Sequence, residues 1–337
     1  MNFRSSFGAL SAIALLLAVP PAGASAQEVE ADLATIGPAN AERYVRPLTR
    51  GIALAMGAGA FDGASVLGGL AFDVGVRVSG ALPPPEAEGY RAVLPESVTW
   101  ETGTGEESFQ SPYRPQAGDG TTPTIAGRGA GVVLEPNGDF RAALIASGQA
   151  PSAYEMRLPD GRETPVVPYP VLHASLGIGL ATEVSLRYLP ALEVDAEIGG
   201  LRGVGGGVRH MVTRWFDSPV DVSVTFARQN LEVGEYVAAE STQYGVMAGR
   251  DLGPLSIFAM GVLREGTVDV RYESDNPGNE NPALPPDGTE VHFSEEVPSG
   301  TAFGIGARLQ LLVLNIAGHY TFDDYRLITL KVGFGFD

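Results

Sequence analysis

The sequence predicts an all-β protein: a transmembrane, antiparallel, up-and-down β-barrel of roughly 12 to 14 strands with a short N-terminal helical segment. Three observations predict this fold. Segments of about ten residues alternate between apolar and polar side chains through much of the chain after residue 51. Short joints and longer stretches rich in Pro, Gly and acidic residues separate them, as in successive hairpins. A segment typical of an export signal precedes them all.

That first segment has the pattern of a cleaved secretory signal. Arg4 supplies a basic start, the run from Ala9 to Val19 is apolar, and Ala24-Ser25-Ala26 offers small residues for cleavage. A membrane anchor is the alternative, but the apolar run is short and two prolines follow it. We therefore divide the chain into a signal peptide (1–26), a helical, plug-like segment (27–50) and the barrel (51–337).

Composition narrows the class of protein further. The net charge of −18 argues against nucleic-acid partners. The absence of cysteine is compatible with any compartment. The 44 glycines are scattered through the apolar alternation, which favours closely packed, tilted strands over low complexity. In the plug-like segment, helix formers run from Ala39 to Arg46, Pro47 interrupts them, and Gly51 is a plausible stop.

Period-two alternation defines the strands and leaves two folds open. The clearest cases lie within 72–78, 172–180, 184–188, 220–226, 268–272, 303–311, 312–320 and 328–336. Weaker candidates lie within 90–101, 122–135 and 154–158. In a soluble sandwich the apolar faces point inward. In a bacterial barrel they point to lipid, and the polar faces line the lumen. The export signal and the strand lengths favour the barrel.

Aromatic residues at strand ends support the barrel. Trp215 and Phe216 follow a strand at a short joint, where a membrane-interface girdle would place them, although a sandwich core is the alternative for Trp215. Ile328, Leu330 and Val332 lead to Phe334 and Phe336 on one apolar face, which predicts a lipid-facing closing strand paired with the first strand. An aromatic near the end is typical of barrels recognised by the barrel-assembly machinery, although Asp337 follows it here.

Several stretches together carry a family resemblance. They include "ANAERYVRPLTRGIALAMGAGAF", "LHASLGIGLATEVSLRYLP" and "PVDVSVTFA", all between residues 39 and 227. In this order they resemble a family of uncharacterised bacterial outer-membrane proteins that is similar to the long-chain fatty-acid transporter class of barrels. The resemblance implies a short plug-like helix from Ala39 to Arg50 at the periplasmic mouth. The Asn-Pro-Ala motif of that class is replaced by Gly37-Pro38-Ala39-Asn40, so no binding residue is carried over.

Motifs for catalysis, metals and cofactors are absent from the sequence. The only lysine, Lys331, follows Leu330, which excludes a phosphate-binding G-x-x-x-x-G-K loop. There is no G-x-S-x-G motif, and no H-x-x-x-H pair occurs. We expect no catalytic residue, metal or cofactor. A lipid-cleaving barrel enzyme assembled from distant strands is the weakest of the open hypotheses.

Charged residues on the polar faces are the candidate lumen lining. They are Glu183, Arg187, Asp269, Arg271, Arg308, His319 and Lys331. One interpretation is mutual neutralisation of a polar interior, and the other is a set of fixed charges that tunes the passage of a solute. Acidic loops such as 275–290 are either simply solvated or bridged to lipopolysaccharide through divalent cations.

Together these observations predict an outer-membrane barrel for passive uptake of a small solute, which the family resemblance implies is hydrophobic. The alternative is a closed structural or surface-interaction barrel without transport. The partners expected are outer-membrane lipid and lipopolysaccharide, the assembly machinery and a hydrophobic small-molecule ligand, with no nucleic acid.

Overall fold

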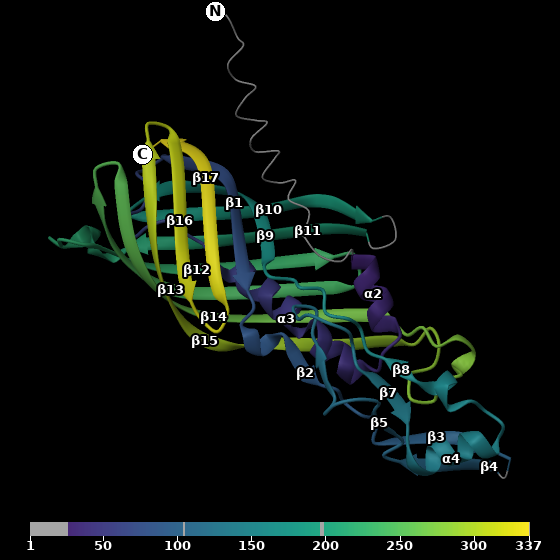
Figure 1. Cartoon of the computed structure of the whole chain (residues 1–337). Coiled ribbons are helices and arrows are strands. Elements are labelled where there is room, and N and C mark those ends of the chain that lie inside the picture. The colour runs from purple at the N-terminus through teal and green to yellow at the C-terminus, as the bar shows by residue number, and fades with distance from the viewer. Residues whose placement is uncertain (1–25, 104, 196–198, 337) are drawn as a thin grey trace, which may run out of the picture.

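The computed structural model describes residues 26–103, 105–195 and 199–336, which form a closed antiparallel barrel (Figure 1). The predicted fold class is confirmed. Ten strands of the described residues close the barrel, so the expected 12 to 14 is too high. Their bounds are β1 Phe72–Leu82, β9 Val167–Gly179, β10 Thr182–Asp195, β11 Gly199–Met211, β12 Asp221–Val233, β13 Val237–Leu252, β14 Leu255–Glu273, β15 Glu290–Leu311, β16 Leu314–Phe322 and β17 Arg326–Phe336.

Each barrel strand pairs with its neighbours along the chain, and β1 closes the ring between β17 and β9. Phe72 lies opposite Phe336, as expected for a closing strand paired with the first strand. We call the end of the barrel that carries these two residues the turn end. Connections there are short, and three of them have two residues (180–181, 253–254 and 312–313). The opposite end, the loop end, carries the connections 83–166 and 274–289.

The barrel wall is uneven in height. Strands β13, β14 and β15 have 16, 19 and 22 residues, whereas β16 and β17 have 9 and 11. All of them reach the turn end, so the difference falls at the loop end. The wall is therefore high at β13–β15 and low at β16, β17 and β1. We call this second part the low side of the wall, where segments at the loop end can pass out of the lumen.

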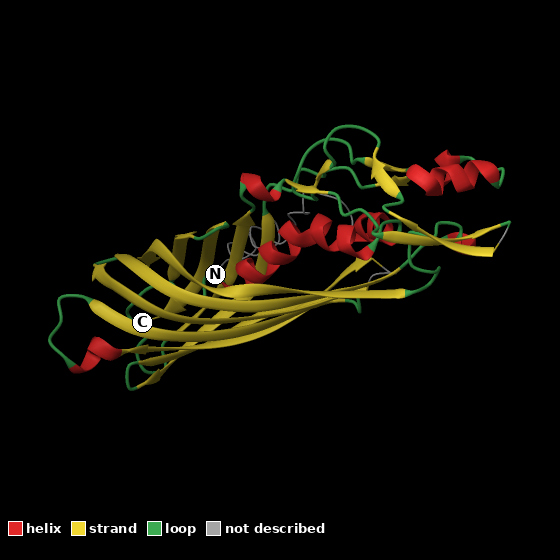
Figure 2. Cartoon of the chain, turned by 90° about the horizontal axis from the view of Figure 1, so that it is seen from below, coloured by secondary structure: helices red, strands yellow, loops and turns green. Residues whose placement is uncertain are grey.

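The N-terminal helices lie at the loop end, and the longer of them runs into the barrel (Figure 2). These are α2, Ala26–Ala34, and α3, Pro38–Gly57. Helix α3 contacts β1 and β9 on one wall and β12–β15 on the other, so it lies inside. It continues through Pro47 to Gly57, and the predicted stop at Gly51 is wrong. Pro47 removes one hydrogen-bond donor, but the helix face around it is buried.

The structure places this helix at the loop end of the barrel, and its location at the periplasmic mouth stays a prediction. Residues Ala41, Tyr44 and Val45 share a core with the insertion at the loop end, not with the turn end. Deeper in the barrel, Ala53 to Met56 pack against inward side chains such as Val268 and Leu327. The helix therefore fills the barrel from the loop end downward. None of the helices in the described part of the chain is both long and apolar enough to cross a membrane.

The 83–166 connection forms a small unit of its own at the loop end. Its elements are η1 Pro85–Ala87, β2 Gly89–Arg91, β3 Ser97–Thr102, β4 Gly105–Gln110, β5 Tyr113–Pro115, β6 Thr121–Pro123, β7 Val133–Pro136, α4 Gly138–Ala146, η2 Pro151–Tyr154 and β8 Met156–Arg157. Rings of Trp100, Phe140 and Tyr154 pack edge to face within it. The weak strand candidates of the sequence lie in these small sheets, which explains the overestimated strand number.

The outer face of the barrel changes character along each long strand. On β14 the outward side chains are apolar from Leu255 to Leu263, and from Glu265 onward they are charged or, at Thr267, polar. Those nine residues are close to the 9 to 11 residues that a tilted strand needs to cross a bilayer. On the inner face of the upper half, Val268, Val270 and Tyr272 are buried. Near the turn end the outer face of the barrel is therefore apolar. Near the loop end the outer face is polar and the inner face is apolar, as in a soluble protein.

Aromatic side chains mark both borders of this apolar band. Trp215, Phe216, Phe334 and Phe336, the predicted interface aromatics, are exposed at or near the turn end. Trp215 closes the short helix η3, Val212–Trp215, between β11 and β12. Further pairs lie at the upper border: Phe226–Tyr244, with ring centroids 5.3 Å apart, and Tyr320–Phe322, 4.7 Å apart.

Candidate functional site

The candidate site is the lumen at the level of the apolar band. Residues 58–71 descend from α3 to the start of β1 and occupy this space. Ala60, Phe61 and Ala64 of this segment pack against inward side chains of β13 and β14 (Met247, Phe258, Met260). We call residues 58–71 the plug. The rest of its attachment to the wall is polar.

The first polar attachment, the Asp62 latch, ties the plug to β1 and β17. Asp62 accepts a hydrogen bond from Arg77 Nη2 at 2.7 Å and one from Lys331 Nζ at 2.8 Å. Arg77 and Lys331 face each other on paired strands. Arg77 also donates to the carbonyl oxygen of Gly59, and Lys331 forms an ion pair with Asp73. Arg77 is 0% and Lys331 4% exposed, so these charges are almost wholly desolvated.

A second polar attachment lies on β10 and β11. Arg209 forms an ion pair with Glu183 and donates to the carbonyl oxygen of Gly63 in the plug. Glu183 also accepts a hydrogen bond from the backbone N–H of Leu67 at 3.1 Å. The Arg209 guanidinium lies 5.1 Å from the centre of the Phe61 ring. One buried ion pair therefore holds the plug at three points.

A third attachment holds the end of α3. Arg187 of β10 donates to the carbonyl oxygen of Met56 at 3.0 Å and to Gln229 at 3.1 Å. Met56 is in the last turn of α3, where unpaired carbonyls and the helix dipole favour a cation. Gln229 in turn contacts Tyr169. Three polar attachments thus hold the helix end and the plug to the barrel wall at the level of the apolar band.

The predicted lumen residues divide into two groups. Glu183, Arg187, His319 and Lys331 are buried inside the barrel, and Arg308 faces inward, half-buried. Asp269 and Arg271 lie on the outer face, and their prediction was wrong. Their part of β14 rises above the apolar band, where the inner face packs on the helices and the outer face is polar. Asp269 contacts His292 there, at 3.4 Å.

Sequence reasoning missed Asp62, Arg77 and Arg209. Asp62 stands in a glycine-rich connection without periodicity, so no pattern placed it in the lumen. Arg77 and Arg209 do alternate with valines in their strands, and that signal was available. The described residues contain no group of three or more metal-ligating side chains. His173 contacts Ser175 at 3.0 Å, but its Nδ1 has no hydrogen-bond partner among them, so no Ser-His-acid relay forms there.

Gly59 occupies the most constrained point of the Asp62 latch. Its φ is +67°, and an added Cβ would lie 2.7 Å from Thr329 and 2.8 Å from Arg77 Nη1. We expect Gly59→Ala to lower the free energy of unfolding by about 1 to 3 kcal/mol. Gly63→Ala is the matched control, since nothing lies within 4 Å of its Cβ and its φ is not positive. Urea-induced unfolding in detergent micelles measures both; equal midpoints would contradict this latch geometry.

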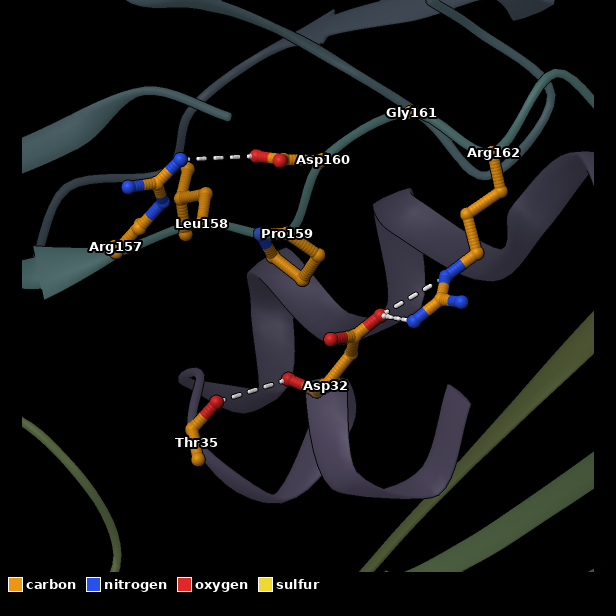
Figure 3. A pocket seen from close by; sticks show the side chains of 8 residues that line it. All are labelled: Asp32, Thr35, Arg157, Leu158, Pro159, Asp160, Gly161 and Arg162. Carbon is orange, nitrogen blue, oxygen red and sulfur yellow. Dashed lines mark hydrogen bonds and ion pairs between the residues drawn. The ribbon is translucent and has the colours of Figure 1, made fainter. Parts of the chain in front are cut away.

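Two clefts open at the loop end. The larger, about 600 Å³, is lined by Asp32, Thr35 and residues 157–162 (Figure 3). Arg162 reaches from the insertion to Asp32 of α2, with contacts of 2.5 and 3.1 Å. Tyr44 donates to the carbonyl oxygen of Asp160, and burial raises the pKa of Tyr44 to about 12. Because its charges pair with one another, this cleft fastens α2 to the insertion. The second cleft, about 450 Å³, lies beside α3.

Comparison with known proteins gives a family and distant structural similarities. Among solved structures, the attachment invasion locus protein Ail of Yersinia pestis is 10% identical, with a TM-score of 0.23, covering 80% of this chain and 98% of its own. The translocator domain of autotransporter NalP from Neisseria meningitidis is 11% identical, with a TM-score of 0.30, covering 80% and 89%. The Ralstonia pickettii toluene transporter TbuX is 10% identical, with a TM-score of 0.27, covering 90% and 98%.

No curated protein matches the chain. Residues 6–336 match the profile of a family described as "Family of unknown function (DUF6588)". This match spans nearly the whole sequence, from the predicted export signal to the last described strand. The chain therefore belongs to the DUF6588 family.

Proposed function

We propose that this protein is an outer-membrane barrel that admits a small hydrophobic solute through a lumen gated by its own plug. The apolar band supports the membrane location. Leu180 and Leu312, 79% and 94% exposed, occupy turns at the turn end with φ of 49° and 56°. Turns with such dihedrals usually take Gly or Asn. Leucine there suits a turn that contacts the hydrocarbon border rather than water.

The observation that carries the gating proposal is the Asp62 latch. A permanently closed barrel would be at least as stable with an apolar plug, because replacing a buried ion pair with packed hydrophobic residues is often neutral or stabilising. A buried ion pair, by contrast, can be broken when water enters the lumen, because water then solvates the separated charges of the plug and the wall. The plug also contains Gly59, Gly63, Gly68 and Gly69, which leave its backbone free to change conformation. Both features favour a displaceable plug.

The second candidate function is a closed barrel with a structural or surface-interaction role. The filled lumen favours it, since the plug and α3 occupy the space that a solute would cross. The insertion at the loop end supplies a surface for contacts. This candidate and the gated barrel differ in one respect: only the gated barrel requires the plug to move.

A disulfide lock separates the two candidates. A Cβ built on Gly57 lies 2.8 Å from Ser241 Oγ, close to the distance of about 3 Å from a Cβ to the far sulfur of a disulfide. Because the chain has no cysteine, Gly57→Cys with Ser241→Cys introduces the only thiols. We expect uptake of small apolar solutes into proteoliposomes when the pair is reduced, and loss of most uptake when it is oxidised.

The control disulfide joins two wall strands and leaves the plug free. Ser79 and Thr329 face each other on β1 and β17, with their hydroxyl oxygens 3.1 Å apart. Oxidised Ser79→Cys with Thr329→Cys should retain uptake. If neither reduced protein takes up any solute class while both fold, the closed barrel is correct. Equal uptake by the oxidised and reduced Gly57–Ser241 pair would contradict gating in which the plug moves together with the end of α3.

A further inference from the structure

The second cleft at the loop end is rich in arginine. Arg43, Arg46 and Arg50 lie along one face of α3 at spacings of three and four residues, and all three line it. Tyr90 of β2 and Tyr325 of the β16–β17 turn lie across the cleft from the helix. In a chain with a net charge of −18, three arginines on one face of one helix are a notable local concentration.

The carboxylates paired with Arg50 and Arg46 differ in exposure. Arg50 Nη2 contacts Asp324 at 3.1 Å, and Asp324 is 73% exposed. Arg46 contacts the partly exposed Glu42 at 3.3 Å and the buried Glu295 at 3.2 Å. Glu86 also lines the cleft. The solvent-exposed pair of Arg50 with Asp324 contributes little stability, so an anion that binds several guanidinium groups at once can compete with it.

Other hydrogen-bond donors of the same cleft are unused. Tyr90 Oη and Arg50 Nε are both buried and have no hydrogen-bond partner among the described residues. Arg43 is exposed, and no carboxylate of residues 26–103, 105–195 or 199–336 forms an ion pair with it. Burial raises the pKa of Tyr90, so its hydroxyl stays protonated and can donate at neutral pH. The cleft therefore offers donors of two kinds to an acceptor-rich group.

The position of the cleft indicates where that group comes from. Asp324 and Tyr325 belong to the turn between Phe322 and Ile328, which are outward, exposed and apolar. The next outward residue beyond Ile328 is Arg326. The cleft thus opens one short turn beyond the apolar band, on the low side of the wall. In bacterial barrels the short turns face the periplasm and the longer loops face outward, so headgroups of outer-leaflet lipids would lie at this height.

We propose that this cleft binds the phosphate of an outer-leaflet phosphorylated glycolipid, with Arg43 and Arg50 as its principal ligands. The inference rests on the proposed membrane position but not on transport. Guanidinium groups bind phosphate through paired, charge-assisted hydrogen bonds, which lysine cannot match in geometry. The bound lipid would fasten α3 to the membrane surface beside the low wall.

The test uses the full-length protein in zwitterionic detergent and measures the binding of fluorescent diphosphoryl lipid A by polarisation. We expect the lipid to bind at least about tenfold more tightly than its dephosphorylated form. Arg43→Gln with Arg50→Gln should weaken binding by about tenfold or more. The matched control is Arg128→Gln with Arg141→Gln, which removes the same charge from exposed sites in the insertion and should change nothing.

Each other outcome overturns the proposal. Equal loss in both double variants would show bulk charge rather than a site. Equal binding of the dephosphorylated lipid would remove phosphate as the recognised group. Inorganic phosphate should displace the lipid only at concentrations at least about tenfold higher than unlabelled lipid does; equal potency would mean a free-anion site and contradict the lipid assignment. Because no uptake is measured, failure here leaves the gating proposal to its own experiment.

Discussion

Asp62→Asn is expected to destabilise the plug and to open the lumen. The substitution keeps the size of the side chain but leaves Arg77 buried without a carboxylate. Removing one partner of a buried ion pair typically costs about 3 to 5 kcal/mol, and the lower end applies because Lys331 keeps Asp73. We expect this loss in urea-induced unfolding in micelles. In planar bilayers the variant should show larger or more frequent conductance events than the wild type.

The control for this prediction is Asp324→Asn. It removes the same charge from an ion pair at the surface, that of Arg50, and should cost less than about 1 kcal/mol. It should not change conductance, because Asp324 lies outside the lumen. If Asp62→Asn also left both stability and conductance unchanged, the plug would not be held by its ion pairs.

Ala259→Arg is expected to destabilise the folded barrel in lipid. Ala259 faces outward on β14, midway between Leu255 and Leu263. A charged side chain on the lipid face of a barrel costs about 2 to 4 kcal/mol at the bilayer midplane. Equilibrium folding into lipid vesicles, monitored by protease protection and gel mobility, gives this difference directly.

Ala238→Arg provides the same chemical change above the apolar band. Ala238 is exposed on β13 and pairs with Asp269 of β14, so an arginine there gains water and a nearby carboxylate. We expect a change of less than about 0.5 kcal/mol. Equal destabilisation by the two substitutions would place residues 259 and 238 in the same environment and contradict the position of the band.

The sequence predicted correctly which strand face points outward wherever lipid contacts the outer face and the inner face is polar. On β9 from Leu172 onward, on β16, and on β17 from Ile328 onward, the large apolar residues point outward as expected, and Glu183, Arg187 and Lys331 point inward. The same logic failed for Asp269 and Arg271, because β14 leaves the apolar band after Leu263. The signal exists in the sequence: apolar residues of β14 occupy both odd and even positions from Ile257 to Leu263, and only even positions from Val268 onward.

The plug and the insertion were harder to predict for a different reason. Asp62 lies in a connection whose conformation is set by the wall around it, and a single carboxylate among glycines has no periodic signal. The strands of the insertion have two to six residues, too few to show alternation clearly. Their core forms with α2 and α3, residues far away in the sequence. Long-range packing, rather than local pattern, determines both.

The central claim is that lipid contacts the outer face near the turn end and water contacts it near the loop end. Fluorophores on Ala259→Cys and Ala238→Cys, in protein reconstituted into vesicles, test this directly. The fluorophore at residue 259 should be quenched by lipids brominated in their acyl chains, and the one at 238 by aqueous iodide alone. If iodide quenched both fluorophores and brominated lipid neither, the outer face would be wet throughout, and the account of a membrane barrel would be wrong.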